Sequence, residues 1–191
     1  HPLLEYHEEN PAFPANPDLY QQSPLPSITE VRWTEPLPTS TMLVMDVSSS
    51  MTEEIEDAKI GAGLYVDLMR RVDRGGIVQF SETVKVYQQM TGDTALLKQT
   101  INNAELSAGT AIYDALMTAI TGIKSEIGRR CVIIYTDGGD NSSRIRPQAV
   151  IDSARIYNLP IYTIALGTQT HEDTLQQIAD STNGIFFKAA T

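Results

Sequence analysis

The sequence predicts an α/β fold: a doubly wound, mostly parallel six-stranded sheet with one antiparallel edge strand and helices on both faces. Short apolar runs alternate along the chain with longer segments in which apolar residues recur at steps of three and four. This pattern is typical of strands that alternate with amphipathic helices. The runs 77–80 and 84–87 are separated only by Ser81-Glu82-Thr83, which indicates a hairpin and therefore one antiparallel edge strand.

The first strand and the first helix follow each other closely. The run 41–47 is mostly apolar, as expected of a strand that is buried in a parallel sheet. From 52 to 72, helical spacing places one apolar stripe on Ile55, Ala58, Ala62, Tyr65, Met69 and Val72. Glu53 and Glu54 lie in the first turn of this helix, where carboxylates favour the positive end of the dipole.

The elements after the hairpin continue the alternation. Helices are expected near 93–102 and over 111–127, and the second carries a clear apolar stripe. The strongly apolar run 131–135 is the next strand, in which the single cysteine, Cys131, is expected to be a small buried apolar residue. The remaining elements are a helix that begins at Pro147 and ends before Pro160, a strand over 161–166, a short helix over 172–179 and a strand over 185–187.

Prolines and glycines divide the chain near Ser40. Eight of the ten prolines precede this position, whereas every glycine follows it. Helices and central strands do not tolerate so many prolines. Residues 1–40 are therefore predicted to be a Pro-rich extended arm or linker, and residues 41–191 the folded domain. Because the arm carries the only tryptophan, Trp33, and further large apolar side chains, we expect it to pack on the domain; a linker from a preceding domain is the alternative.

Composition excludes two kinds of interaction. The 191 residues carry a formal net charge of -10, whereas nucleic-acid binding needs a basic patch or stripe. No apolar run approaches the ~20 residues that span a bilayer, and no signal-peptide pattern is present. We therefore expect neither a nucleic-acid partner nor a membrane span. Because the sequence begins with His1 rather than Met, we expect a processed product or an excised piece.

One loop concentrates oxygen donors directly after the first strand. Asp46-Val47-Ser48-Ser49-Ser50 presents one carboxylate and two hydroxyl ligand groups between a strand and a helix. Oxygen donors at such close spacing suit a hard divalent cation, because Mg²⁺ takes oxygen ligands in a compact octahedral arrangement. Serine in this position is also a common helix N-cap, and this alternative stays open at the level of the sequence.

Two further segments supply oxygen donors where the chain leads into helices. Gly109-Thr110 precedes one helix, and Thr136-Asp137-Gly138-Gly139 follows the strand 131–135. Ligands of open α/β sheets bind outside the carboxyl ends of the strands. We therefore predict that five residues converge on one Mg²⁺, or on Mn²⁺ or Ca²⁺: Asp46, Ser48, Ser50, Thr110 and Asp137. Asp114 and Asp140 are predicted to support these ligands without touching the ion; alternatively, Asp114 favours the helix dipole and Asp140 solvates its loop.

The order of these motifs resembles the von Willebrand factor type A (VWA) domain family, whose metal-ion-dependent adhesion site (MIDAS) is written Asp-x-Ser-x-Ser, a distant Thr and a distant Asp-Gly. The resemblance runs from about Thr41 to the end of the sequence and includes the segments 74–81, 109–116, 135–138 and 161–167. Ser49 departs from the pattern, because members commonly carry Gly between the two Ser ligands. A second departure is that the chain stops soon after its last strand, where members commonly close with a helix.

The resemblance implies a Rossmann-like VWA fold and a function in metal-dependent protein binding. In this function the ion captures an Asp or Glu side chain of a partner protein. The chain is most similar to bacterial, exported members, which implies an extracellular, cell-surface or periplasmic location. The alternative is an intracellular, cytoplasmic VWA subunit that partners an AAA+ ATPase or a chelatase.

The sequence lacks the motifs of several common enzyme classes. It contains neither a Gly-x-Ser-x-Gly nucleophile elbow nor a P-loop. Gly61-Ala62-Gly63 lies inside a predicted helix, and Val66 stands where a dinucleotide fingerprint needs its third glycine. A bound metal ion can activate water, but the sequence identifies no general base beside the predicted site. We therefore predict that the chain is not an enzyme.

Overall fold

The computed structural model describes residues 37–167 and 172–189. Its centre is a six-stranded sheet in the order β3-β2-β1-β4-β5-β6, in which β3 is antiparallel to β2 and all other neighbours are parallel. The strands are β1 (Thr39–Asp46), β2 (Arg74–Phe80), β3 (Val84–Thr91), β4 (Arg129–Thr136), β5 (Ile161–Ala165) and β6 (Phe186–Lys188). This arrangement confirms the predicted doubly wound sheet with one antiparallel edge strand.

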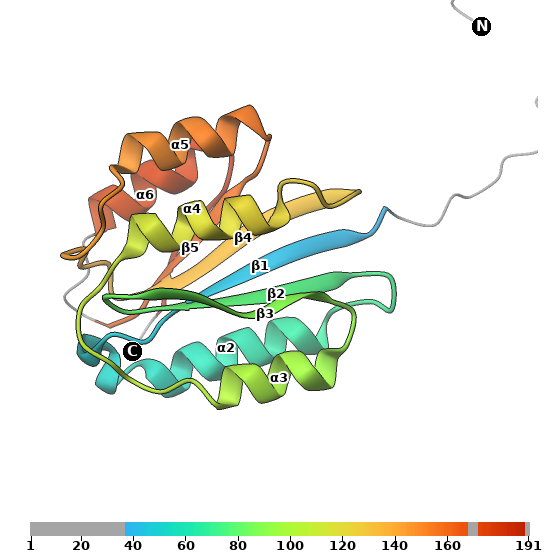
Figure 1. Ribbon diagram of the computed structural model, residues 1–191, viewed down its shortest axis with the longest axis horizontal. Coiled ribbons are helices and arrows are strands. Elements are labelled where there is room, and N and C mark those ends of the chain that lie inside the picture. Colours follow the sequence, from blue (N-terminus) through green and yellow to red (C-terminus); the bar gives the residue numbers. More distant parts are fainter. Residues whose placement is uncertain (1–36, 168–171, 190–191) are drawn as a thin grey trace, which may run out of the picture. The chain divides into compact units, whose positions relative to one another are not determined.

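Helices cover both faces of the sheet. The helices are η2 (Ser49–Thr52, a 3-10 helix), α2 (Ile55–Asp67), α3 (Thr94–Asn102), α4 (Ile112–Ile123), α5 (Pro147–Ile156) and α6 (Glu172–Ser181). Figure 1 shows α4, α5 and α6 on one face and α2 and α3 on the other. Pro147 occupies the first turn of α5, as the sequence predicts.

Two helices are shorter than predicted. The segment 52–72 is not one helix, because η2 ends before α2 begins and α2 itself ends at Asp67. The chain turns after α2, where the Asp73 carboxylate accepts hydrogen bonds from the backbone N–H groups of Arg70 and Thr39, both at 2.8 Å. Helix α4 ends at Ile123, and the left-handed Gly128 (φ 92°) then leads the chain into β4.

Strand β2 begins earlier than predicted because two glycines belong to it. It starts at Arg74, so that Gly75 and Gly76 lie inside the sheet. A Cβ on Gly76 would lie 2.9 Å from the sulfur atoms of both Met42 and Met90. Glycine therefore allows these two side chains to pack directly against the strand.

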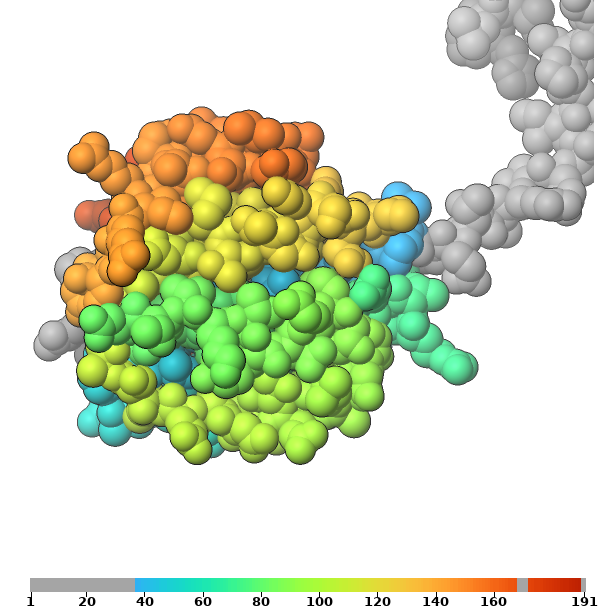
Figure 2. Space-filling model, viewed as in Figure 1, coloured from blue at the N-terminus to red at the C-terminus, as the bar shows by residue number. Residues whose placement is uncertain are grey.

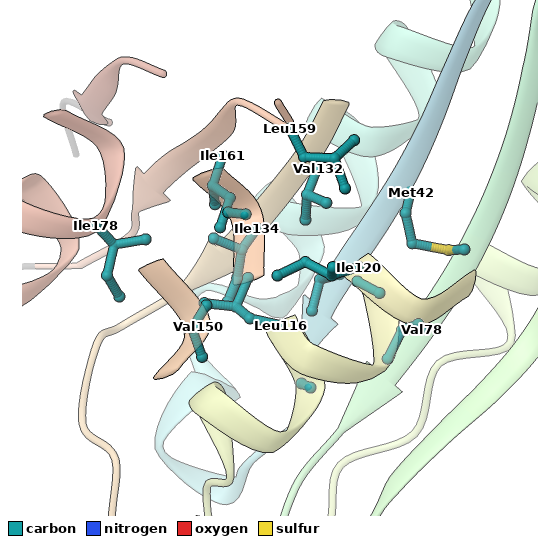
Figure 3. Packing of buried hydrophobic residues seen from close by; sticks show 14 of the residues in the cluster. Met42, Val78, Leu116, Ile120, Val132, Ile134, Val150, Leu159, Ile161 and Ile178 are labelled. Carbon is teal, nitrogen blue, oxygen red and sulfur yellow. The ribbon is translucent and has the colours of Figure 1, made fainter. Parts of the chain in front are cut away.

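Hydrophobic cores on both faces hold the central strands in place. The β1 side chains Met42, Leu43, Val44 and Met45 have no exposed surface. The core beside α4 and α5 includes the residues labelled in Figure 3, which are Met42, Val78, Leu116, Ile120, Val132, Ile134, Val150, Leu159, Ile161 and Ile178. A second core contains Leu43 and Met45 together with apolar residues of α2 and α3. Because close-packed cores resist displacement, the ends of β1 and β4 provide fixed starting points for the loops that follow.

The single cysteine differs from its prediction. Cys131 is half-buried rather than fully buried, and its Sγ lies 3.3 Å from the Oγ1 of Thr41. Desolvation raises the pKa of the Cys131 thiol. A thiol with a raised pKa is protonated at neutral pH and therefore a poor nucleophile, which agrees with a structural role in β4.

The predicted arm over residues 1–40 lies almost entirely outside the described residues. Only its last four residues, 37–40, are described, and Thr39 and Ser40 belong to β1. Strand β1 thus begins two residues before the predicted start of the domain at Thr41. The expected packing of Trp33 and its apolar neighbours on the domain stays a prediction.

Candidate metal centre

Three loops that carry the predicted ligands lie at one edge of the sheet. The first follows β1, the second precedes α4, and the third follows β4. Figure 1 shows the carboxyl ends of β1 and β4 and the amino end of α4 at the same side of the domain. In doubly wound sheets this edge is the usual position of a ligand site.

Asp46 ends β1 and is held at both carboxylate oxygens. Its side chain is completely buried. Oδ1 accepts a hydrogen bond of 2.8 Å from the backbone N–H of Ser48, and Oδ2 accepts one of 2.6 Å from the Thr136 hydroxyl. These two contacts fix the plane of the carboxylate and therefore its direction at the end of the strand.

The two serines of the first loop are arranged as a hydroxyl pair. Ser48 stands at the N-cap position of η2, but its side chain makes no capping hydrogen bond. Its Oγ instead lies 2.9 Å from the Oγ of Ser50. The geometry therefore does not support the N-cap alternative for Ser48. The buried Ser48 and the exposed Ser50 place their oxygens side by side, with one of the two open to solvent.

Ser49, which departs from the pattern of the family, fits without strain. Among the described residues, the positive-φ positions other than glycine are Asn158 and Asn183, so Ser49 does not need a left-handed backbone. It is exposed and begins the 3-10 helix η2. A Cβ is tolerated there because this loop turns through ordinary right-handed conformations.

Thr136 connects the first and third loops, and sequence reasoning did not identify it as a site residue. Its completely buried hydroxyl donates to Asp46 Oδ2 and accepts a hydrogen bond of 3.0 Å from the backbone N–H of Gly138. Asp137, the half-buried residue between them, thereby stands next to the Asp46 carboxylate. In the sequence, its role is indicated only by its position directly before the predicted ligand Asp137.

Thr110 belongs to the second loop, which contacts the other two. Ser107 pairs with Ser48 in an isolated parallel bridge, and the Ser107 N–H donates to the carbonyl of Val47 at 2.8 Å. On the other side, the Thr110 N–H donates to Asn141 Oδ1 at 2.9 Å. The buried Thr110 is therefore held between the loop after β1 and the loop after β4.

The two acids that the sequence predicts to support the site, Asp114 and Asp140, lie between the start of α4 and the loop after β4. Asp140 Oδ1 accepts hydrogen bonds from the backbone N–H of Ile112 at 2.8 Å and from the Ser143 hydroxyl at 2.6 Å. The Asp114 carboxylate accepts from the backbone N–H of Arg144 at 3.1 Å and of Ile145 at 2.9 Å. Both acids join the start of α4 to the loop after β4, which goes beyond a role in solvation or in the helix dipole alone.

The electrostatics of the site favour a cation. The pKa of Asp46 is raised to about 6, mainly by burial and in smaller part by the Asp137 carboxylate, while the hydrogen bonds from Ser48 and Thr136 oppose the rise. Within the described part of the chain, no Lys or Arg forms an ion pair with Asp46. Two neighbouring carboxylates without a cationic partner, accompanied by hydroxyl oxygens, match the ligand preferences of Mg²⁺, Mn²⁺ or Ca²⁺.

The fold and these three loops define the class of the protein. It is a doubly wound α/β domain with a candidate cation site, lined by oxygen atoms, at the carboxyl ends of its parallel strands. The chain belongs to the von Willebrand factor type A domain family, whose model matches residues 42–191. This match confirms the family that the motifs of the sequence suggest. The VWA fold is known for metal-dependent protein interaction.

Curated bacterial proteins are similar in sequence to this chain. An uncharacterized protein of Synechocystis sp. is 28% identical over 159 residues, which cover 78% of this chain and 37% of that protein. The chain spans less than half the length of the curated relatives that it matches.

Solved structures share the fold at low sequence identity. One is proximal thread matrix protein 1 from the mussel byssus with a zinc-occupied MIDAS motif, at a TM-score of 0.72 and 23% identity, covering 81% of this chain and 42% of that chain. Another is the vWF domain of the type V pili tip protein Mfa5 from Porphyromonas gingivalis, at a TM-score of 0.68 and 14% identity, covering 82% and 90%.

We expect Gly109→Ala to destabilise the protein and to weaken cation binding. Gly109 has a left-handed backbone (φ 78°), and a Cβ there would lie 2.6 Å from Glu82 Cβ and 3.0 Å from Ser142 Oγ. A left-handed backbone costs an L-residue about 1–2 kcal/mol, and the clash displaces the adjacent Thr110. Thermal unfolding measures the loss of stability, and calorimetric titration with Mg²⁺ measures the loss of affinity.

Gly63→Ala is the matched control for this substitution. Gly63 lies in α2, and a Cβ there meets no atom within 4 Å. Because Ala is a better helix former than Gly by about 1 kcal/mol, we expect a slightly higher melting temperature and unchanged Mg²⁺ affinity. A Gly109→Ala protein that matches the wild type in both measurements would contradict the prediction.

Proposed function

We propose that this chain is a metal-dependent protein-binding module for adhesion or recognition. In this proposal five side chains hold one divalent cation, Mg²⁺ or alternatively Mn²⁺ or Ca²⁺: Asp46, Ser48, Ser50, Thr110 and Asp137. The observation that carries it is that the buried Asp46 lies near Asp137 beside the hydroxyl pair, and that no Lys or Arg of the described segments forms an ion pair with either carboxylate.

The charge of the site indicates what it binds. Two carboxylates cancel at most the two positive charges of a divalent ion, and the hydroxyl ligands add no charge. When bound, such an ion offers a position for one more oxygen anion, for which an Asp or Glu carboxylate of a partner protein is suited. The chain's own residues orient the donors: Thr136 and the Ser48 N–H fix Asp46, and the loop before α4 holds Thr110.

The surroundings of the ligands are accessible to a macromolecule. An open recess of about 420 Å³ is lined by Ser50, Thr52, Glu53, Glu54, Asp137, Leu166 and Gly167. On the neighbouring loop, Leu106 is 40% exposed one residue before Ser107. Because Glu53 and Glu54 repel a free carboxylate, an acidic side chain of the partner would enter favourably only with the cation in place. This arrangement supports cation-dependent rather than purely electrostatic capture.

We infer an extracellular, cell-surface or periplasmic location and a role without catalysis. The likeness to a pilus tip protein supports the location, and VWA domains with adhesion and recognition roles are typically non-enzymatic. In the part of the chain that the structure describes, no helix has both the length and the apolar character for crossing a bilayer.

The test is affinity capture with the full 191-residue chain immobilised. Extract of the source organism is passed over it in Mg²⁺, and the retained proteins are eluted with EDTA and identified by mass spectrometry. We expect at least one protein that is retained in Mg²⁺, released by EDTA, and not retained by Asp137→Ala. The control Asp93→Ala, which removes the N-cap of α3, keeps retention. Binding that ignores both EDTA and Asp137→Ala would overturn the proposal.

A further inference from the structure

Helix α4 begins without a cap from its own residue. Its N-cap position is Ala111, which makes no side-chain hydrogen bond to the first turn. The N–H groups of the first turn of a helix need partners from outside the helix. Here Asp140 Oδ1 accepts from the Ile112 N–H at 2.8 Å, and Ser143 Oγ accepts from the Tyr113 N–H at 2.9 Å. The loop after β4 therefore caps a helix that begins 28 residues before Asp140.

The same two segments are also joined through Thr110 and Asp114. The Thr110 carbonyl accepts hydrogen bonds of 3.0 Å from the N–H groups of both Asn141 and Ser142, while the Thr110 N–H donates to Asn141 Oδ1. The Asp114 carboxylate in turn accepts from the backbone N–H of Arg144, at 3.1 Å to Oδ1 and 3.2 Å to Oδ2. We call residues 140–143 the capping loop. In Figure 2 its orange surface meets the yellow-green residues before α4 and the green turn after β2.

The position of the capping loop matters for the ligands. Thr110 lies directly before the N-cap residue of α4, and Asp137 lies three residues before Asp140. The capping loop therefore sets where one predicted ligand lies relative to another. Side chains that orient metal ligands without touching the metal typically change its affinity by 10–100-fold when they are removed.

We propose that Asp140 is a positioning residue for the cation, which together with Asn141 and Ser143 fixes Thr110 relative to Asp137. The inference rests on the proposed cation site and adds a determinant of its affinity. Asp140 acts through its hydrogen bonds to Ile112 and Ser143. Its charge is not the feature that matters, so an isosteric amide retains the function.

The test compares Mn²⁺ and Mg²⁺ affinity, by calorimetry, with melting temperature in EDTA for variants of the full chain. We expect Asp140→Ala to weaken cation binding about tenfold or more. Asp140→Asn keeps an oxygen acceptor for the Ile112 N–H and stays within about threefold of the wild type. Asp93→Ala is the matched control, because Asp93 caps α3 through the Leu96 N–H at 3.0 Å. It lowers the melting temperature but leaves cation affinity unchanged.

Each other outcome has a defined meaning. Asp140→Ala with wild-type affinity overturns the positioning role, and so does Asp140→Asn that binds as weakly as Asp140→Ala, because charge rather than geometry is then decisive. Wild-type protein that binds neither ion overturns the proposed cation site together with this inference. If Asp140→Ala does not fold, Asn141→Ala decides, since it removes the nearer acceptor of the Thr110 N–H, at 2.9 Å against 3.4 Å for Ser142 Oγ; unchanged affinity in that variant overturns the inference.

Discussion

Replacing Asp46 by Asn is expected to remove divalent-cation binding, with an affinity loss of about 100-fold or more, because cation affinity follows the charge of the ligands. The substitution keeps the shape of the side chain and an acceptor for the Ser48 N–H. It removes one of the two carboxylates on which the proposed site depends. Calorimetric titration with Mg²⁺ and Mn²⁺ measures the effect.

The same substitution is expected to raise the thermal stability of the metal-free protein, although it lowers the affinity for cations. At pH 8 the metal-free Asp46→Asn protein should melt at a higher temperature than the metal-free wild type, because it no longer buries an unpaired carboxylate. Asp57→Asn is the control, since Asp57 is an exposed carboxylate in the first turn of α2. Cation binding by Asp46→Asn at wild-type affinity would exclude Asp46 as a ligand.

The metal-free protein is expected to lose stability as the pH rises from 5 to 8. The pKa of Asp46 is raised from 3.8 to about 6 in the folded protein, so the folded state binds this proton more tightly than the unfolded state does. The contribution of Asp46 to stability is therefore greatest below pH 3.8, falls as the pH passes from 3.8 to about 6, and stays low above that. The difference in pKa corresponds to about 3 kcal/mol in total, of which a little less than half, about 1.4 kcal/mol, is lost between pH 5 and 8.

A second carboxylate acts in another pH range. The Arg70 guanidinium holds the pKa of Asp73 well below its usual value. The stabilisation that Asp73 contributes is fully present above pH 3.8. It is lost only as the pH falls below that value, outside the range from pH 5 to 8. Of the two described carboxylates with a shifted pKa, Asp46 is therefore the one whose titration changes stability within that range.

Thermal unfolding in EDTA between pH 5 and 8 measures this effect. A decrease of roughly 3–6 °C is expected for a domain of this size, and Mg²⁺ should raise the melting temperature more at pH 8 than at pH 5. In Asp46→Asn the decrease should largely disappear. A wild-type melting temperature that is flat or rises with pH would contradict the assignment of a raised pKa to Asp46.

The order of strands and helices was predictable because each element buries one face or two. Residues 42–45 of β1 form a buried apolar run, and the stripe on α4 has helical spacing. The start of β2 was not predictable in the same way. Gly75 and Gly76 usually mark turns, and their place in a strand depends on Leu97, Met42 and Met90 packing against them.

The candidate ligands could be predicted from the sequence because each has a side-chain oxygen and lies at the end of a strand or the start of a helix. Whether all five bind one ion is the subject of the predictions above. The residues that orient them could not be read from the sequence. Thr136 reaches Asp46 only because β1 and β4 pair side by side with Met45 opposite Tyr135. Asn141 and Ser143 act across about 30 residues of chain, a contact that only the tertiary fold creates.

The shared capping of α4 also has a consequence for the order of folding. A helix that carries its own cap can form its first turn early, from local contacts alone. The first turn of α4 takes its partners from Asp140 and Ser143, so the chain must close a loop of about 30 residues before this turn is capped. Contacts of long sequence separation slow folding. We therefore expect the edge that carries Thr110 and Asp137 to be among the last parts of the domain to become ordered.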